Sequence, residues 1–453
     1  MDWKNVKHWL VPSLPELQWP LSLPAGLRHY RRERNGQLVR MHLRVEHSGQ
    51  ALLLAAATEA VRLTQVGAIT AYGILEGHSD QQITQYLAGS PDALEIINSV
   101  RDLIDQLGLP NKRYPIFNLL DTLDAERPLG LVAPFQADVE VGDPGATKIY
   151  LQKLWAAGIP HVRFVQSDAK DCSDQFLASL CGVVDYAESI GMIAGVRLPA
   201  SRLMQQDATN QRSAIDQLAE LGLDYVVVPW AVNKPCHHQV FGSEDLQCLD
   251  NLIERTDHWE IPVVLESGLI PKTMVGFAEH LEPWVARGIQ YVEVFAVASV
   301  HADTSGGQSA SEEAIPWSVF PACHLRQLAC WTEDLADNRN IHITWLPPQT
   351  AERTDSQNSI IEILRAGPRT GGDVCVRIDL EGNLYTARGP YISIGKIHQS
   401  PWSELWNHPC FGRYRDLVCH HDHCQQCTFL TVCATHCPAD PDSWAAGRRT
   451  RIS

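Results

Sequence analysis

A glycine followed by an apolar, β-branched run recurs along the chain with a period of about thirty residues. The clearest copies are Gly158 with 159–164, Gly222 with 223–228 and Gly288 with 289–295; weaker ones follow Gly191 and cover 261–265. Glycine commonly ends a helix, and continuous apolar strands are typical of parallel sheets covered on both faces. The repeat therefore predicts an α/β fold over 125–365, either a partial (β/α) barrel or an open parallel sheet.

Length and net charge limit the functions that this chain can have. The chain has 453 residues, enough for more than one domain. Its net charge of −16 argues against a nucleic acid or an anionic membrane as partner, because both bind basic surfaces. No apolar run approaches the roughly 20 residues of a membrane span, and the start lacks the apolar region of a signal peptide. We expect a cytoplasmic protein whose partners are proteins, peptides or small molecules.

The first hundred residues divide into two parts. Residues 1–36 carry tryptophans, prolines and a basic stretch over 29–34, with little periodicity, and we expect an extended arm. Residues 37–108 read as three strands followed by three helices, which is a winged-helix pattern. The expected strands cover 39–45, 51–54 and 61–63, and the expected helices 65–76, 79–88 and 91–107. Ser79 and Gln82 fit a capping box at the second helix.

Four cysteines lie close together near the C-terminus: Cys424, Cys427, Cys433 and Cys437. Clustered thiolates in a reducing compartment indicate a bound metal rather than disulfides. Cys375 and Cys419 are further candidate ligands, and 366–453 is expected to form a small cysteine-rich domain. Zinc and a [4Fe-4S] cluster both accept four thiolates, so either is open. The fourth ligand comes from the stretch 419–423, or the four clustered cysteines enclose one ion themselves.

Residues 59–67 and 75–78 resemble the small peptide chaperone of pyrroloquinoline quinone biosynthesis. Its wider family is the recognition element that binds leader peptides of ribosomally made natural products. The resemblance implies that a leader peptide adds as a strand to a sheet edge. The implied groove lies between one strand and one helix, with the candidate residues Val61, Arg62, Leu63, Val100, Leu103 and Ile104. The alternative is a winged helix that only packs against its neighbours.

The order of winged helix, βα barrel and cysteine-rich tail resembles a radical S-adenosylmethionine enzyme of the SPASM group. Within the tail, Cys375, the stretches 382–385, 394–397 and 403–406, and the four clustered cysteines resemble the SPASM domain. The resemblance implies a partial TIM barrel of radical S-adenosylmethionine type over 125–365. It further implies a SPASM-like domain over 366–453 that carries iron–sulfur clusters.

The motifs that hold the family's cofactors are altered in this chain. The family places three cysteines after its first barrel strand, whereas here the expected strand 133–141 runs into 142–146 and no cysteine precedes Cys172. The family's Gly-Gly-Glu-Pro turn falls on 166–169, which reads Gln-Ser-Asp-Ala. In the tail, Ala387 stands where the family has a cysteine, and none follows Cys437. We therefore expect no reductive cleavage of S-adenosylmethionine, since the cofactor carries that chemistry.

The leading hypothesis is a pseudoenzyme that binds a peptide or a catalytic partner protein during peptide or cofactor maturation, with a C-terminal zinc or iron–sulfur site. One alternative is an active oxidoreductase or peptide-modifying enzyme that uses the C-terminal cluster. Another is a metal-stabilised interaction protein without peptide specificity. No catalytic acid or base is apparent: Asp168, Glu266 and Glu293 near predicted strand ends are expected to be hydrogen-bonding groups at the barrel mouth. Cys236 to His238 are expected in a loop after a strand, with the two histidines facing solvent; the alternative is a ligand role.

Overall fold

The structure is a computed structural model that describes residues 22–411, apart from internal gaps. The residues outside the description are 1–21, 35–36, 56, 58, 89, 108–130, 167–173, 207–210, 242–247, 300–319, 322–324, 346–348, 351–374, 387–392, 410 and 412–453. The chain divides into two compact units. The first contains Met1–Ala133 and Trp155–Pro160, and the second contains Pro134–Leu154 and His161–Ser453.

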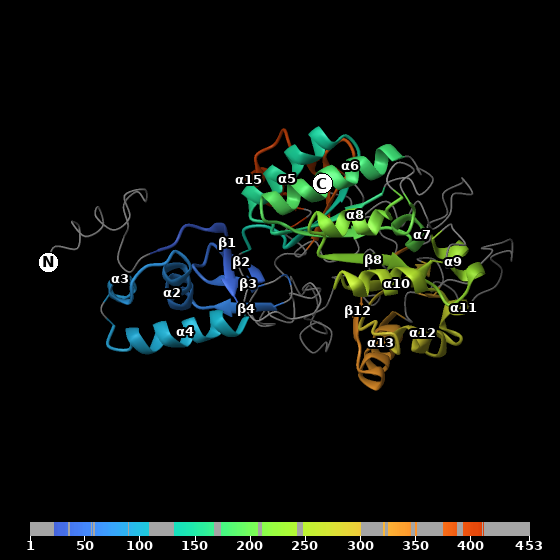
Figure 1. Ribbon diagram of the computed structural model, residues 1–453, viewed down its shortest axis with the longest axis horizontal. Helices are drawn as coiled ribbons and strands as arrows, with labels where there is room; N and C mark the ends of the chain where they lie inside the picture. Colours follow the sequence, from blue (N-terminus) through green and yellow to red (C-terminus); the bar gives the residue numbers. More distant parts are fainter. Residues whose placement is uncertain are drawn as a thin grey trace. The chain divides into compact units, whose positions relative to one another are not determined.

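The first unit combines one antiparallel sheet with three helices (Figure 1). Its elements are β1 (Gly26–Arg34), β2 (Gln37–Val45), β3 (Ala51–Ala55), β4 (Glu59–Leu63), α2 (Gln65–Leu75), α3 (Asp80–Tyr86) and α4 (Ala93–Leu107). The sheet order is β1-β2-β3-β4. Alternate residues of β2, such as Met41 and Leu43, share a core with apolar residues of α2 and α4, as the period-2 pattern predicts. The predicted capping box of Ser79 and Gln82 begins α3.

The N-terminal stretch requires a correction. We expected residues 1–36 to form an extended arm before the compact unit, yet Gly26–Arg34 is strand β1 and pairs antiparallel with β2 along its whole length. The basic residues concealed the strand pattern, because they alternate with other polar residues rather than with apolar ones. Tyr30 supplies the missing apolar contact, since its ring packs against the core of the unit. The sheet of the first unit therefore starts before residue 37.

The second unit is a mixed α/β structure built on a parallel sheet. Its strands are β5 (Gln136–Glu140), β6 (His161–Val165), β7 (Ile193–Arg197), β8 (Tyr225–Pro229), β9 (Val263–Leu269), β10 (Tyr291–Ser299), β11 (Phe320–Pro321), β12 (His342–Trp345), β13 (Gln349–Thr350), β14 (Cys375–Ile378), β15 (Asn383–Thr386) and β16 (Gly395–Lys396). Its helices are α5 (Pro144–Ala157), α6 (Asp174–Ser189), α7 (Ala200–Leu203), α8 (Ala214–Glu220), α9 (Lys234–Phe241), α10 (Leu249–His258), α11 (Pro271–Met274), α12 (Phe277–Val285), α13 (Leu325–Arg339) and α15 (Trp402–Trp406). No helix among the described residues is both long and apolar enough to cross a membrane.

Strands β5 to β10 lie side by side in chain order, and each pairs parallel with the next. Parallel strands in sequential order, joined by right-handed crossovers, place their connecting helices on one face of the sheet. Consistent with this, α6, α8 and α10 pack against one another along the strands (Figure 1). The opposite face of the sheet can then face inward when the sheet curves.

The predicted helix ends are confirmed. Gly158, Gly191, Gly222 and Gly288 have φ angles of 98°, 90°, 91° and 97°. This left-handed conformation is strained for residues with a side chain and is readily adopted by glycine. Each glycine lies a few residues before a strand of the parallel sheet, so the period read from the sequence is the period of the βα units.

The described part of the predicted cysteine-rich domain joins the same sheet. Strand β14 pairs parallel with β5 and antiparallel with β15, which pairs with β16. Strands β14, β15 and β16 consequently continue the sheet beyond β5 and belong to the second compact unit. The four clustered cysteines and Cys419 lie outside the described residues.

Candidate functional site

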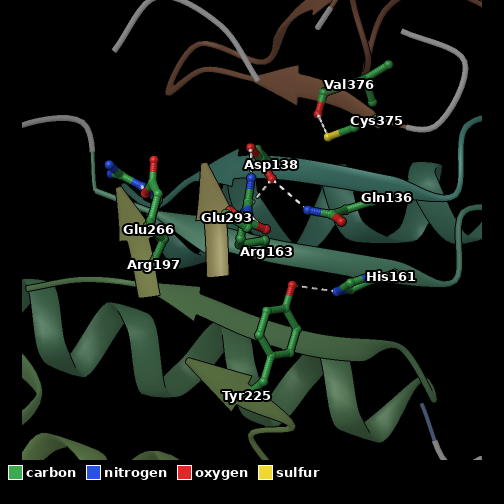
Figure 2. A network of polar contacts seen from close by, with 10 residues as sticks. All are labelled: Gln136, Asp138, His161, Arg163, Arg197, Tyr225, Glu266, Glu293, Cys375 and Val376. Atoms are coloured by element: carbon green, nitrogen blue, oxygen red, sulfur yellow. Dashed lines mark hydrogen bonds and ion pairs between the residues drawn. The ribbon is translucent and has the colours of Figure 1, made fainter. Parts of the chain in front are cut away.

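Charged side chains from strands β5, β6 and β10 of the second unit meet in one network (Figure 2). Arg163 on β6 donates to both carboxylate oxygens of Asp138 on β5, at 2.8 Å from Nε and 2.8 Å from Nη2. Its Nη1 atom donates to both oxygens of Glu293 on β10, at 3.1 Å each. All three side chains are buried. Every nitrogen of the Arg163 guanidinium is thus engaged by a carboxylate of the same sheet.

The hydrogen bonds between Arg163 and Glu293 indicate that the sheet is curved. Three strands separate β6 from β10 in the strand order, which in a flat sheet would put them about 19 Å apart. Their side chains nevertheless meet at 3.1 Å. The sheet must curve strongly enough for distant strands to face each other, as in a partial barrel whose interior is filled by side chains.

Further polar pairs line the same interior. Arg197 at the end of β7 binds Glu266 on β9, and Arg377 on β14 binds Glu140 at the end of β5. Nearer the start of the strands, the Tyr225 hydroxyl and His161 Nε2 are 2.6 Å apart (Figure 2). The interior of this barrel therefore carries ion pairs and hydrogen bonds where barrel cores are usually filled by Val, Ile and Leu.

Burial and pairing together set the charges in this network. Burial alone would raise the pKa of Asp138, but the charge and hydrogen bonds of Arg163 outweigh it and hold that pKa below its usual range. Burial raises the pKa of Glu293 above its usual value despite Arg163. Burial and the charge of Arg163 lower the pKa of Arg197 to about 10. Asp138, Arg163 and Arg197 are consequently charged at neutral pH.

His161 is held neutral by its surroundings. Burial, followed by the charge of Arg163, lowers its pKa to about 3, and burial raises the pKa of Tyr225 well above its usual value. The imidazole of His161 and the phenol of Tyr225 therefore both stay neutral near pH 7. This end of the interior is held together by the hydrogen bond between His161 and Tyr225.

The family that the sequence resembles holds its catalytic cluster after the first barrel strand. The matching connection in this chain joins β5 to α5. Here it is three residues long, because β5 ends at Glu140 and α5 begins at Pro144. Val141 is buried, and the Asp143 carboxylate accepts a hydrogen bond of 2.8 Å from the Ala146 amide, which caps α5. A methyl group added at Gly142 would lie 3.0 Å from the Leu380 side chain in the β14–β15 turn. These residues provide no thiolate, so they do not fit a cysteine-bound cluster.

The six predicted peptide-binding residues lie in the first unit as expected. Strand β4, which carries Val61, Arg62 and Leu63, is at one end of the sheet order. Leu63, Val100 and Ile104 are buried in the core, with Val61 and Leu103 packed against it. Arg62 donates to the Gln50 side chain at 3.2 Å. Three of the six predicted groove residues are therefore core residues, and Val61, Arg62 and Leu103 are more accessible.

Two cysteine predictions fall on described residues. Cys375 is buried in β14 and shares a strand face with Arg377, which points its guanidinium at Glu140. Cys236 and His237 were expected in a solvent-facing loop, and this is wrong: both lie in α9 and are buried. The His237 ring nitrogen Nε2 lies 3.1 Å from the Pro229 carbonyl oxygen. Among the described residues, no group of three or more potential metal ligands comes together.

Glu266 and Glu293 were expected to be hydrogen-bonding groups at the barrel mouth. Both accept hydrogen bonds, as buried members of ion pairs with Arg197 and Arg163. Asp168 lies outside the described residues. Sequence reasoning missed Asp138, Arg163 and Arg197. The signal was clear for Arg197 alone, because it is the one charged residue of the apolar strand β7, whereas β5 also contains Gln136 and Glu140 and β6 also contains His161.

No protein-family model and no curated protein match the chain. Among solved structures, SuiB of Streptococcus suis bound to S-adenosylmethionine is similar over 90% of this chain and 95% of that one, with a TM-score of 0.51 and 10% sequence identity. The structure of anSMEcpe with bound AdoMet and a peptide covers 67% of this chain and 88% of that one, with a TM-score of 0.42 and 9% identity. The likeness to SuiB shows a shared fold.

Proposed function

We propose that this chain is a peptide-binding or partner-binding protein on a radical S-adenosylmethionine enzyme fold that has lost the radical chemistry. The three-residue connection between β5 and α5 carries the proposal. A cluster that cleaves S-adenosylmethionine needs thiolates to hold its iron. In this chain the connection is used to cap a helix and to pack against Leu380.

The interior ion pairs support the same proposal. In an enzyme barrel, functional residues project from the C-terminal ends of the strands. Here Glu140 and Arg197, the last residues of β5 and β7, bind Arg377 and Glu266. The polar groups at this end are thus engaged with one another, and a ligand would have to displace buried ion pairs to reach them.

Peptide binding is proposed for strand β4 and helix α4 of the first unit. Strand β4 pairs with β3 on one side and ends the sheet order on the other. An exposed strand edge can accept an extended peptide through backbone hydrogen bonds. Val61 and Leu103, partly buried beside the core, would meet the side chains of that peptide.

The cysteine-rich tail is proposed to hold zinc or an iron–sulfur cluster through Cys424, Cys427, Cys433 and Cys437, with Cys375 and Cys419 as further candidates. The group would stabilise the tail by its binding energy. The test is iron, sulfide and zinc quantitation of protein purified without oxygen, for the native chain and for Cys424→Ser. Loss of metal in the variant supports the ligand assignment.

The test of the central proposal is incubation of anaerobically reconstituted protein with S-adenosylmethionine and a strong reductant, followed by quantitation of deoxyadenosine and methionine. We expect no product above the protein-free control. The electron paramagnetic resonance spectrum of any cluster should also be unchanged by S-adenosylmethionine. Stoichiometric deoxyadenosine would overturn the proposal.

The peptide-binding part needs its own test. Short peptides encoded by genes adjacent to the gene of this protein would be titrated by calorimetry into the native protein and into the variants Leu103→Glu and Val61→Glu. Binding that both variants weaken, together with slower hydrogen exchange in β4, supports the proposed edge. Binding that leaves β4 exchange unchanged places the peptide elsewhere.

A further inference from the structure

Arg197 at the end of β7 is only partly engaged by the ion pair that it forms. Its Nε atom donates to the Glu266 carboxylate, whereas its Nη1 and Nη2 atoms have no hydrogen-bond partner among the residues that the structure describes. Arg163 differs, because Nε, Nη1 and Nη2 of its guanidinium all donate to carboxylates. The N–H donors of the two terminal nitrogens of Arg197 therefore remain for another group.

Solvent reaches Arg197 but not the carboxylate beside it. The Arg197 side chain is 20% exposed, and the Glu266 side chain is 0% exposed. The other ion pair at this end of the strands, Arg377 with Glu140, is buried more deeply, with 9% of each side chain exposed. Arg197 is thus an exception among the polar groups at this end, because a ligand can reach its outer nitrogens without breaking the pair with Glu266.

The positive charge of Arg197 is incompletely compensated. Burial, and then the charge of Arg163, lower the pKa of Arg197 to about 10. The guanidinium is still charged at neutral pH, but a lowered pKa means that its surroundings destabilise the cation. An additional anion at the outer nitrogens would stabilise this charge.

Apolar side chains flank Arg197 on both neighbouring strands. In the parallel register, Val165 of β6 and Val227 of β8 lie directly beside it, and both are buried. Register partners in a sheet point to the same face. A group bound to Arg197 would therefore have mainly apolar surroundings, which suits an anionic group attached to an apolar body.

Glu266 limits the charge that this position accepts. Its carboxylate lies beside the Arg197 guanidinium (Figure 2) and repels a second anion, more strongly for two negative charges than for one. A carboxylate carries a single charge and matches two guanidinium nitrogens in a two-pronged geometry. These two features favour a carboxylate over a phosphate.

We propose that Arg197 binds the carboxylate of an apolar ligand through Nη1 and Nη2, while Nε stays bonded to Glu266. The carboxylate belongs either to a small apolar acid or to the C-terminus of a peptide that ends in an apolar residue. The inference goes beyond the proposed function and does not rest on it, because neither the loss of radical chemistry nor the β4 edge enters the argument.

The probe is para-fluorobenzoate, titrated into the full-length protein and followed by fluorine NMR relaxation, which detects weak binding. The comparison compound para-fluorobenzamide has a similar shape and no charge. We expect saturable binding of the benzoate and at least roughly tenfold weaker binding of the benzamide. Displacement of the benzoate by the peptide Ala-Ala-Phe, but not by its C-terminal amide, would identify a peptide as the ligand; displacement by neither would identify a small acid.

Two variants test whether Arg197 is the binding residue. In Glu266→Gln the amide can still accept from Nε while the negative charge is absent, so binding of para-fluorobenzoate should become at least roughly threefold tighter. In Arg197→Gln/Glu266→Gln both charges are removed together, so that no buried carboxylate loses its cation. Binding to this double variant should be at least roughly tenfold weaker than to the native protein.

The matched control is Arg255→Gln. Arg255 also donates from Nε to one carboxylate, that of Asp216, but its side chain is 46% exposed and lies on α10 rather than on a strand. This variant should change the affinity for para-fluorobenzoate less than about twofold. Hydrogen exchange of the β5 to β10 peptides checks that all three variants fold.

Four outcomes would overturn the inference: no binding of para-fluorobenzoate, equal binding of the benzamide, undiminished binding to the double variant, or weaker binding to Glu266→Gln. Tighter, Arg197-dependent binding of para-fluorophenyl phosphate would overturn the choice of a carboxylate. None of these outcomes bears on S-adenosylmethionine cleavage or on the Leu103→Glu variant. Failure here is therefore distinguishable from failure of the proposed function.

Discussion

Arg163 of β6 holds Glu293 of β10 by two hydrogen bonds of 3.1 Å, although β7, β8 and β9 lie between these strands. The same guanidinium binds Asp138 on the neighbouring strand β5. One side chain thus joins the start and the end of the six-stranded parallel segment. The curvature that brings β6 and β10 together is stabilised from inside by this arginine.

Removing Arg163 should leave two buried carboxylates without their cation. We expect Arg163→Met to lower the free energy of unfolding of the second unit by about 3–5 kcal/mol. Hydrogen exchange of the β5 to β10 peptides measures this unit separately from the first. The control Arg287→Met breaks the exposed pair with Asp250 and should cost less than about 1 kcal/mol.

A triple variant tests whether the network is needed at all. Asp138→Leu/Arg163→Met/Glu293→Leu replaces the buried ions with apolar groups of similar size, which is often neutral or stabilising. If the triple variant recovers most of the stability that Arg163→Met loses, the three charged side chains are needed only to neutralise one another. A triple variant as unstable as the single one would contradict this account.

The fold was largely predictable, and the network only in part. Helix-ending glycines such as Gly158 and Gly222 carry a local signal, because their backbone conformation depends on the residue itself. Glu293 was expected to be a hydrogen-bonding group, but its partner Arg163 was not predicted, since that contact depends on the curvature of the whole sheet. Strand β1 was missed because its arginines conceal the alternation.

Gly195 on β7 should tolerate no side chain. A methyl group there would lie 2.1 Å from the Tyr225 ring, so Gly195→Ala must displace a buried aromatic residue. We expect a loss of about 3 kcal/mol or more in the second unit, by hydrogen exchange. Gly182→Ala in α6, with nothing within 4 Å of the added methyl group, should be neutral or stabilising by up to about 1 kcal/mol.

The same clash can be relieved from the other side. In a Tyr225→Leu background, the ring atoms nearest Gly195 are absent, and the additional cost of Gly195→Ala should fall by at least about half. Additive losses would show that the glycine is required for a reason other than the Tyr225 ring.

The stability of the second unit should fall as the pH is lowered through the ordinary range of histidine. The pKa of His161 is about 3 in the folded chain and 6.5 in the unfolded one. Below pH 6.5 the unfolded state binds a proton that the folded state does not, so stability decreases towards pH 3. The slope from this residue is about 1.4 kcal/mol per pH unit.

Comparison with His161→Gln isolates this contribution, because the amide can still bond to the Tyr225 hydroxyl. Between pH 6 and pH 5 we expect a shallower loss of stability in the variant, by hydrogen exchange. Glu293, whose raised pKa acts in the opposite direction, is present in both proteins and cancels. Identical pH slopes would show that His161 is not the group responsible.

Asp143 offers a test of the short connection itself. Its carboxylate caps α5 by accepting from the Ala146 amide. We expect Asp143→Ala to destabilise the second unit by about 1 kcal/mol, and Asp143→Asn to preserve most of the cap, since asparagine is an equally good capping residue. Hydrogen exchange in the first turn of α5 measures both. If Asp143→Ala left that exchange unchanged, the connection would have no capping role, and the main structural support for the proposed loss of radical chemistry would weaken.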